Sequence, residues 1–202
     1  MVRHIRNIPN QAGEVDSEVI LVVDMNWKPD SLAFSEFVSP ILSAIEGTEP
    51  VLVMHYLEVT LQDVKECSRV ILSGTTLKDF EFQKHLEKFK WLKTLEKPIL
   101  GICAGMQIIS LVYGVPLVEC TQVGMTEIST TKENLLFDGT FQAYTLHSFS
   151  IAPSETFEVL AKSENCIQVI KHKQKLIYGV LFHPEARNIE ILKKFVLINC
   201  PC

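Results

Sequence analysis

Four short runs of consecutive apolar residues, each followed by a segment with helical spacing, restrict the fold of this chain more than any other feature. The apolar runs span residues 19–23, 51–54, 70–72 and 98–102. The helical segments span residues 34–45, 61–67, 80–95 and 106–113. Strands that are apolar throughout are typical of a parallel sheet covered on both faces. The first half therefore predicts a doubly wound α/β sheet with ligands at the carboxyl ends of its strands.

The second half has a different pattern of shorter strand-like pieces. They span residues 117–120, 125–130, 143–151, 157–161, 167–172 and 177–182, and a helical segment at 188–196 closes the chain. We interpret these pieces as antiparallel additions and a return to the sheet. The predicted fold class is α/β, a doubly wound, mostly parallel, flavodoxin-like sheet with antiparallel additions in the C-terminal half. Residues 1–202 are expected to form a single domain with its core at about 19–196.

The composition of the chain argues against nucleic acid and membranes as binding partners. The chain has 202 residues, 47% of them hydrophobic, and a formal net charge of −5 without a long basic run, which argues against nucleic acid binding. No apolar stretch approaches the roughly 20 residues of a membrane span, and the N-terminus does not resemble a signal peptide. We expect a soluble, cytoplasmic protein with a small substrate.

The cysteines and acidic residues give no metal signature. Six cysteines, at positions 67, 103, 120, 166, 200 and 202, lack zinc-type spacing. In a reducing cytosol most are expected to be free thiols, and the final pair at 200 and 202 is interpreted as incidental. Asp24, at the end of the first apolar run, is assigned a capping role rather than a phosphate or metal site. We expect no metal.

Residues 101–105 read Gly-Ile-Cys-Ala-Gly, between an apolar run and a helical segment. This arrangement predicts a nucleophile elbow, a sharp strand-to-helix turn that exposes one side chain and in which flanking glycines leave space for the backbone and substrate. Cys103 lies at its tip, where the positive end of the helix favours a thiolate. The alternative is a buried structural cysteine, which the flanking glycines disfavour.

A candidate base for this nucleophile follows the apolar run at 177–182. His183 can relay a proton, and the carboxylate of Glu185, beyond Pro184, can orient its imidazole. Alternatively, a histidine at a strand end is a hydrogen-bonded structural residue. The combination with Cys103 favours a catalytic Cys-His-Glu triad.

The sequence Gly-Ile-Cys-Ala-Gly-Met-Gln at 101–107, together with Phe-His-Pro-Glu at 182–185, resembles the class I, triad-type glutamine amidotransferases. Segments at 136–139, 147–153 and 177–180 match that family in order and spacing. The resemblance covers residues 19–195. Among subfamilies, the chain is most similar to the stand-alone amidotransferase subunits of two-subunit GMP synthases.

The resemblance implies a reaction. Cys103 attacks the side-chain amide of glutamine, His183 protonates the leaving ammonia, and water releases glutamate from a γ-glutamyl thioester. The backbone N–H of Ala104 is placed to stabilise the oxyanion.

The main departure from the family lies in the loop that supplies its second oxyanion donor. The family has Gly-Gly-Pro there, whereas this chain has Ser-Gly-Thr-Thr at 73–76, so the donors would come from Gly74 and Thr75. Threonine does not readily adopt positive φ. We therefore expect the isolated chain to be a weak glutaminase that a partner activates by placing this loop.

Several residues match family positions around the substrate glutamine. These are Gln107, Gly124, Ser148 and Phe149. Gln107 is alternatively an ordinary solvent-facing helix residue. His147 matches a histidine that faces the synthetase in many relatives, and its alternative is a structural surface role.

The resemblance also implies a partner. The chain lacks a Gly-x-x-x-x-Gly-Lys-Ser/Thr loop, so we expect no cofactor and assign the nucleotide-consuming step to an ATP-dependent synthetase on another chain. Two alternatives remain open. One is a γ-glutamyl hydrolase or cysteine peptidase on the same fold, and the other is a non-catalytic regulatory subunit with a degenerate oxyanion loop.

Overall fold

The fold is known from a computed structural model, which describes residues 4–6 and 19–199. The strands are β1 His4–Arg6, β2 Ile20–Asp24, β3 Val51–His55, β4 Arg69–Leu72, β5 Ile99–Ile102, β6 Leu117–Thr130, β7 Thr140–Ile151, β8 Phe157–Lys162, β9 Ile167–His172 and β10 Ile177–Val180. The helices are α1 Ala33–Phe37, α2 Ser39–Ala44, α3 Leu61–Glu66, the 3₁₀ segment η1 Glu81–Lys93, α4 Ala104–Val112 and α5 Ile189–Val196.

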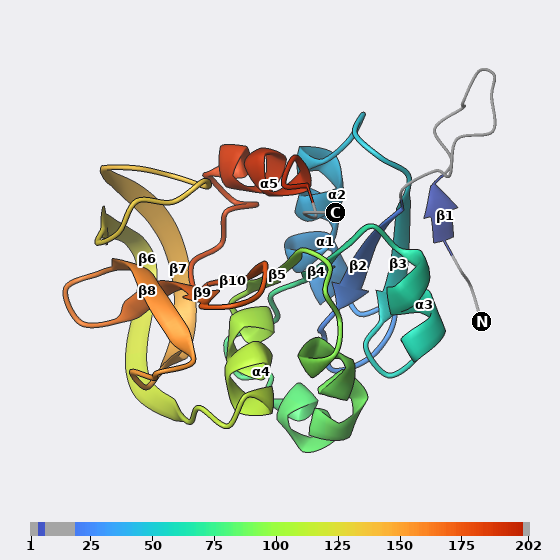
Figure 1. The fold of residues 1–202 in the computed structure, drawn as a ribbon, viewed down its shortest axis with the longest axis horizontal. Helices are drawn as coiled ribbons and strands as arrows, with labels where there is room; N and C mark the ends of the chain where they lie inside the picture. Colours follow the sequence, from blue (N-terminus) through green and yellow to red (C-terminus); the bar gives the residue numbers. More distant parts are fainter. Residues whose placement is uncertain (1–3, 7–18, 200–202) are drawn as a thin grey trace.

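The described strands form one ten-stranded sheet in the order β1-β3-β2-β4-β5-β10-β9-β8-β6-β7 (Figure 1). Neighbours from β3 to β10 in this order pair in parallel. The remaining pairs are antiparallel. The predicted fold class, a parallel core with antiparallel additions in the C-terminal half, is confirmed. The assignment of residues 1–202 to a single domain stays a prediction.

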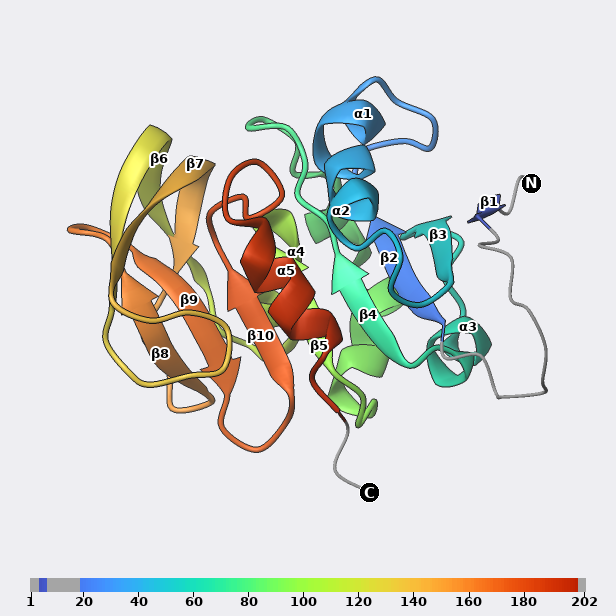
Figure 2. The ribbon, with the colours of Figure 1, turned by 90° about the horizontal axis from the view of Figure 1, so that it is seen from above.

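Helices cover both faces of the parallel core, as the apolar strands predict (Figure 2). One buried cluster joins alternate residues of β2, such as Leu21, to α3, η1 and α4. The other joins the intervening residues, such as Val22, to α2 and α5. Successive side chains of a strand point to opposite faces, so one five-residue strand contributes to both clusters. In the described part of the chain no helix is long and apolar enough to cross a membrane.

Two expected helices differ in the structure. The segment expected at 34–45 is divided at Val38 into α1 and α2, and Pro40 lies in the first turn of α2, where a missing N–H is tolerated. The segment expected at 80–95 is the 3₁₀ element η1, interrupted by non-helical angles at His85. Phe82 and Phe89, on either side of this kink, are both buried in the same core cluster.

The strands differ from expectation at two places. The pieces expected at 117–120 and 125–130 are one strand, β6, whose register with β7 shifts between Glu119 and Gln122. The gap between the two expected pieces, residues 121–124, adjoins this bulge. Strand β1, which pairs with β3 at one edge of the described sheet, was not predicted, because three residues carry too short a pattern.

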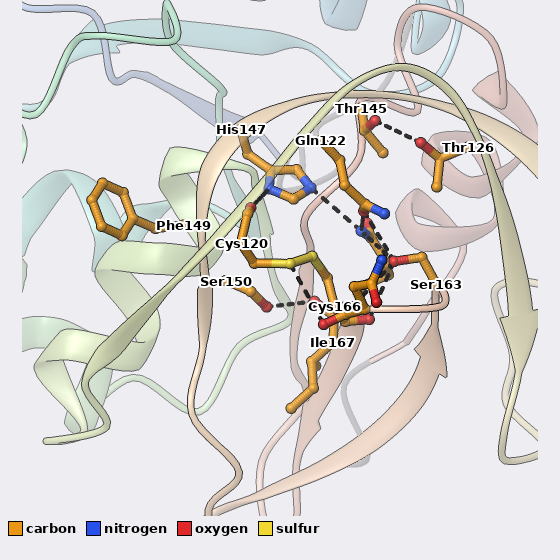
Figure 3. Close-up of a disulfide and its surroundings, with 12 residues drawn as sticks. Cys120, Gln122, Thr126, Thr145, His147, Phe149, Ser150, Ser163, Cys166 and Ile167 are labelled. Atoms are coloured by element: carbon orange, nitrogen blue, oxygen red, sulfur yellow. Dashed lines mark hydrogen bonds between the residues drawn. A yellow bond between two sulfur atoms is a disulfide. The ribbon is translucent and has the colours of Figure 1, made fainter.

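A disulfide joins the antiparallel strands (Figure 3). Cys120 on β6 is bonded to Cys166, in the turn between β8 and β9, with Cα atoms 6.2 Å apart. The expectation of mostly free thiols is therefore wrong for these two, whereas Cys67 and Cys103 are free. The final cysteines, at 200 and 202, lie outside the described residues. Sequence spacing did not reveal the pair because the strand order alone brings the two residues together.

Reduction of this disulfide should lower the free energy of unfolding by roughly 2–4 kcal/mol, because the bond constrains a long loop of the unfolded chain. The loop is long because the two cysteines lie 46 positions apart. Urea denaturation with and without reductant measures the difference. In a Cys120→Ala/Cys166→Ala variant the reductant should have no effect. Equal wild-type midpoints in both conditions would contradict the pairing.

Candidate active site

Cys103 lies at a strained turn between β5 and α4. Its backbone angles are φ 47° and ψ −100°, and among the described non-glycine residues only Asp30 also has positive φ. Its N–H donates to the carbonyl of Val180, and its own carbonyl accepts from the N–H of Gln107, the first hydrogen bond of the helix. Such a conformation costs of order 1–3 kcal/mol and is typical of functional sites. The strained strand-to-helix turn that the sequence predicts is present, and the role of Cys103 as a nucleophile stays a prediction.

The glycines on either side of Cys103 are required by close packing. A Cβ on Gly101 would lie 2.4 Å from the carbonyl carbon of Gly105, and a Cβ on Gly105 would lie 2.6 Å from the carbonyl oxygen of Leu72. Neither is among the described glycines with positive φ. Neighbouring backbone occupies the space that a side chain at either glycine would need. The absence of these side chains therefore lets α4 lie close to β4 and β5.

The pairing of β5 with β10 brings His183 to the elbow. Gly101 and Val180 lie on these parallel strands, in a register that pairs residue 101 with 179 and residue 102 with 180. Both strands therefore end at the same edge of the sheet. Cys103 follows β5 directly, and His183 follows β10 after two residues, with its N–H donating to the carbonyl of Tyr144.

His183 and Glu185 form a buried pair. The Nδ1 atom of His183 lies 2.8 Å from Oε1 of Glu185, and each side chain is only 2% exposed. Burial by itself lowers the pKa of His183, but the Glu185 carboxylate and the adjacent Cys103 raise it well above its ordinary value. Among the described residues Nε2 of His183 has no hydrogen-bond partner. The arrangement favours an imidazolium beside the Cys103 sulfur.

A small cavity lies in front of the sulfur. Its volume is about 10 Å³, and its walls include Thr75, Cys103, Ala104, Gln107 and Ser148. This is room for about one water molecule, so glutamine requires the mouth of the cavity to widen. The structure thus brings the candidate nucleophile, two of the three candidate oxyanion donors and two of the candidate substrate residues to one cavity.

Gln107 is buried rather than solvent-facing, so that alternative is wrong. It is 4% exposed, and its Nε2 donates to the carbonyl of Phe149 at 3.0 Å. Gly124 lies on β6 with φ 106°, and its carbonyl accepts from the Thr145 hydroxyl. Gly124 and Phe149 are not among the residues that line the cavity. Their roles with substrate stay predictions.

Gly74 lies against the imidazole of His183. A Cβ at this position would be 2.7 Å from Cε1 and 3.2 Å from Nδ1 of His183, and 3.3 Å from Cδ1 of Phe37. The Phe37 and His183 rings also pack together, with centroids 5.4 Å apart. The loop at 73–76 therefore forms one side of the pocket that holds the imidazole. The sequence did not identify Phe37, because its aromatic ring has the ordinary appearance of a core residue.

The helix-capping role expected for Asp24 is wrong, because α1 begins only at Ala33 and the Asp24 side chain instead binds Asn26 in the turn after β2. The Oδ1 atom of Asp24 accepts from the backbone N–H of Asn26 at 3.0 Å and from the side-chain amide of Asn26 at 2.6 Å. Burial raises the pKa of Asp24. The carboxylate stabilises the turn after β2 and does not face the cavity in front of Cys103.

His147 is buried in a polar cluster beside the disulfide, contrary to a surface role (Figure 3). Its Nδ1 lies 2.8 Å from the carbonyl oxygen of Cys120, and its Nε2 lies 3.3 Å from Nε2 of Gln168. Burial lowers the pKa of His147 to about 4. The imidazole is therefore neutral at pH 7 and packs within the antiparallel strands.

Replacement of Gly74 by alanine should reduce turnover of the candidate site by about 10-fold or more, because the new Cβ displaces the His183 ring from the sulfur. Steady-state kinetics with glutamine measures the effect, and thermal unfolding verifies the fold. Lys78→Ala, an exposed position in the same connection, is the control. Wild-type turnover in Gly74→Ala would show that the imidazole does not depend on this contact.

His147 should make the protein less stable in acid. A folded-state pKa of about 4, below the ordinary 6.5, means that the unfolded chain binds the proton first. The contribution is fully present above pH 6.5 and is lost as pH falls through 4, by up to about 3 kcal/mol. Urea denaturation between pH 7 and pH 4 should show a shallower decline for His147→Asn. An unchanged slope would be inconsistent with a buried neutral imidazole.

Comparisons with known proteins identify the family of this chain. Residues 37–197 match the family model of class I glutamine amidotransferases. A subunit of the glutamine-hydrolysing GMP synthase of Methanocaldococcus jannaschii is 39% identical over 146 residues, which cover 67% of this chain and 76% of that protein. The corresponding subunit of Methanococcus maripaludis strain C5 is 44% identical over 112 residues, or 50% of this chain and 59% of that protein.

A solved structure has the same fold. The crystal structure of a candidate GMP synthase subunit protein from Thermoplasma acidophilum superposes with a TM-score of 0.77 at 23% identity, covering 89% of this chain and 92% of that one. A glutamine amidotransferase from Thermotoga maritima gives a TM-score of 0.65 at 20% identity, covering 89% and 81%. With the family model matched over residues 37–197, this chain belongs to the class I glutamine amidotransferase family.

Proposed function

We propose that this chain is a glutaminase subunit that releases ammonia from glutamine through a Cys103-His183-Glu185 triad and delivers it to a synthetase. The observation that carries the proposal is the convergence of these residues at the ends of two adjacent parallel strands. A strained cysteine, a buried imidazole and a carboxylate on its far nitrogen are the parts that nucleophilic acyl transfer requires.

The proposed reaction has two halves. The Cys103 sulfur attacks the amide carbon, and the tetrahedral oxyanion receives hydrogen bonds from the N–H of Ala104 and from the loop at Gly74 and Thr75. The C–N bond then breaks as His183 gives its proton to the departing nitrogen, which leaves a γ-glutamyl thioester and ammonia. Water next attacks the thioester, His183 accepts its proton, and glutamate departs with the sulfur restored.

Four residues are proposed to hold the substrate. Gln107 and Ser148 line the cavity, and the Phe149 carbonyl fixes the Gln107 amide. Gly124 lies one strand further from the sulfur, so its contribution requires the substrate's amino-acid end to extend toward β6. Polar groups fixed in this way set orientation in a small site.

The proposed partner is an ATP-dependent synthetase, with GMP synthase as the candidate. Both relatives described above are named as subunits of that enzyme. The sequence has no phosphate-binding Gly-x-x-x-x-Gly-Lys-Ser/Thr loop, so nucleotide chemistry falls to the partner. A cytoplasmic location is part of the proposal.

Loss of the Cys103 sulfur should abolish glutaminase activity. The Cys103→Ala variant should release no ammonia from glutamine, with or without the synthetase. In the wild-type chain, a glutamine-like diazo-ketone should label Cys103 and no other cysteine. Peptide mass spectrometry locates the label, and a coupled glutamate assay follows turnover. Cys67→Ala is the control, because the pKa of that buried thiol is raised to about 11. Labelling at Cys67, or turnover in Cys103→Ala, would refute the assignment.

A further inference from the structure

We propose that the hydroxyl of Thr75 is a positioning group that fixes the oxyanion loop, residues 73–76, by binding between Asn26 and Asp79. The proposal rests on the glutaminase function proposed above and concerns how that site is held. It gives a role to a side chain at a position where the family has glycine. It also assigns Asn26 and Asp79, which the sequence did not identify, to the support of the loop.

We call the contacts of the Thr75 hydroxyl with Asn26 and Asp79 the Thr75 clamp, and two short distances define it. The Thr75 hydroxyl oxygen lies 2.5 Å from Oδ2 of Asp79 and 3.0 Å from Oδ1 of Asn26. All three side chains are buried, with exposed fractions of 3% for Thr75, 8% for Asp79 and none for Asn26. The single hydroxyl proton is thus held between two acceptors from segments on either side of the loop. Buried polar groups of this kind have few alternative partners.

Both acceptors are themselves fixed. The side-chain amide of Asn26 donates to Asp24 at the end of β2, and the backbone carbonyl of Asn26 lies 2.7 Å from Nε2 of His55 at the end of β3. The other oxygen of Asp79, Oδ1, accepts from the N–H of Glu81. The anchors of Thr75 therefore belong to the ends of two core strands and to the start of η1.

A second contact holds the loop two residues earlier. The Ser73 hydroxyl accepts from the N–H of Met25 at 3.0 Å and lies 2.8 Å from the carbonyl oxygen of Gly74. Gly74 is thus bounded by anchored residues on both sides. Because Gly74 lies against the His183 ring, a displaced loop would disturb the imidazole as well as the oxyanion donors.

Threonine suits this role at no conformational cost. Among the described non-glycine residues only Asp30 and Cys103 have positive φ, so the loop does not require Thr75 to adopt a glycine conformation. A β-branched side chain has few rotamers, and fixing its hydroxyl therefore also fixes its backbone. Glycine at this position would have no side chain to anchor. The loop of this chain is accordingly placed by its own contacts, without a partner.

The test compares Thr75→Val, which keeps the shape and removes the hydroxyl, with Thr75→Ser, which keeps the hydroxyl. In the full chain, Thr75→Val should lower kcat for glutamine about 10- to 100-fold with KM within about 3-fold. This loss of kcat is smaller than the roughly 100- to 1,000-fold loss caused by removing one oxyanion donor, because the loop is displaced rather than removed. Thr75→Ser should stay within about 3-fold of wild type. Alkylation of Cys103 by iodoacetamide, which needs no oxyanion donor, should slow less than kcat in Thr75→Val and should keep the wild-type rate in Thr75→Ser.

A double variant and a measurement independent of activity complete the test. Asp79→Asn should lower kcat, and Thr75→Val/Asp79→Asn should be no slower than the slower single variant, because both changes break one unit. Hydrogen exchange of peptides covering residues 73–80 should show protection in the isolated wild-type chain, lost at least 10-fold in Thr75→Val and retained in Thr75→Ser.

Three results would overturn the clamp. These are wild-type kcat in Thr75→Val, equal losses in the valine and serine variants, and a wild-type loop that becomes protected only when the synthetase is added. The last result would instead support placement of the loop by the partner. Failure of the proposed function has a different signature, namely a protected wild-type loop in a chain that hydrolyses no glutamine and whose Cys103 resists the diazo-ketone.

Discussion

The parallel pairing of β5 with β10 is the constraint on which the candidate site depends. The two strands are separated by the whole antiparallel region in the sequence, yet their register places residue 101 opposite residue 179. Parallel neighbours end at the same edge, so the residues that follow them meet there. Cys103 and His183 meet because of this register. A shift of one strand by one residue would turn the side chains of that strand to the other face of the sheet.

The electrostatics of the site follow from the burial that this pairing imposes. An imidazole that is 2% exposed would ordinarily be held neutral, because desolvation disfavours its charged form. The equally buried carboxylate of Glu185 reverses that preference, and the pKa of His183 is raised. Among the described groups that shift the pKa of His147, on β7, there is no carboxylate, and burial lowers this pKa. The pKa values of two buried histidines thus shift in opposite directions, and the Glu185 carboxylate is the largest cause that raises the pKa of His183.

The sequence predicted those features that are encoded locally. Apolar runs identified the core strands, and the glycines around Cys103 identified the elbow. The disulfide of Cys120 with Cys166 and the clamp on Thr75 were not predictable in this way, since each joins residues that only the folded sheet brings together. Threonine at residue 75 was interpreted as a departure because its hydroxyl partners, Asn26 and Asp79, show no pattern in the sequence.

Strand β7 forms the wall of the site opposite Cys103, and it shows why the antiparallel strands matter to the chemistry. Three backbone carbonyls of β7 accept from the site: Tyr144 from His183, Leu146 from the Cys103 thiol and Phe149 from Gln107. Strand β7 is last in the order of the described sheet and has one neighbouring strand, β6. Carbonyls of β7 that are directed away from β6 therefore remain available to accept hydrogen bonds from the site.

The position of that wall depends in turn on β6. Strand β6 pairs with β8 through only two residue pairs, at Ser129 and Thr130, near its far end. Toward its other end, the disulfide of Cys120 with Cys166 and the contacts of the Gln122 amide oxygen with Ser163 and Gln168 link β6 to the turn after β8 and to β9. The acceptors that face the nucleophile are therefore positioned by a hairpin whose attachment to the rest of the sheet is partly covalent.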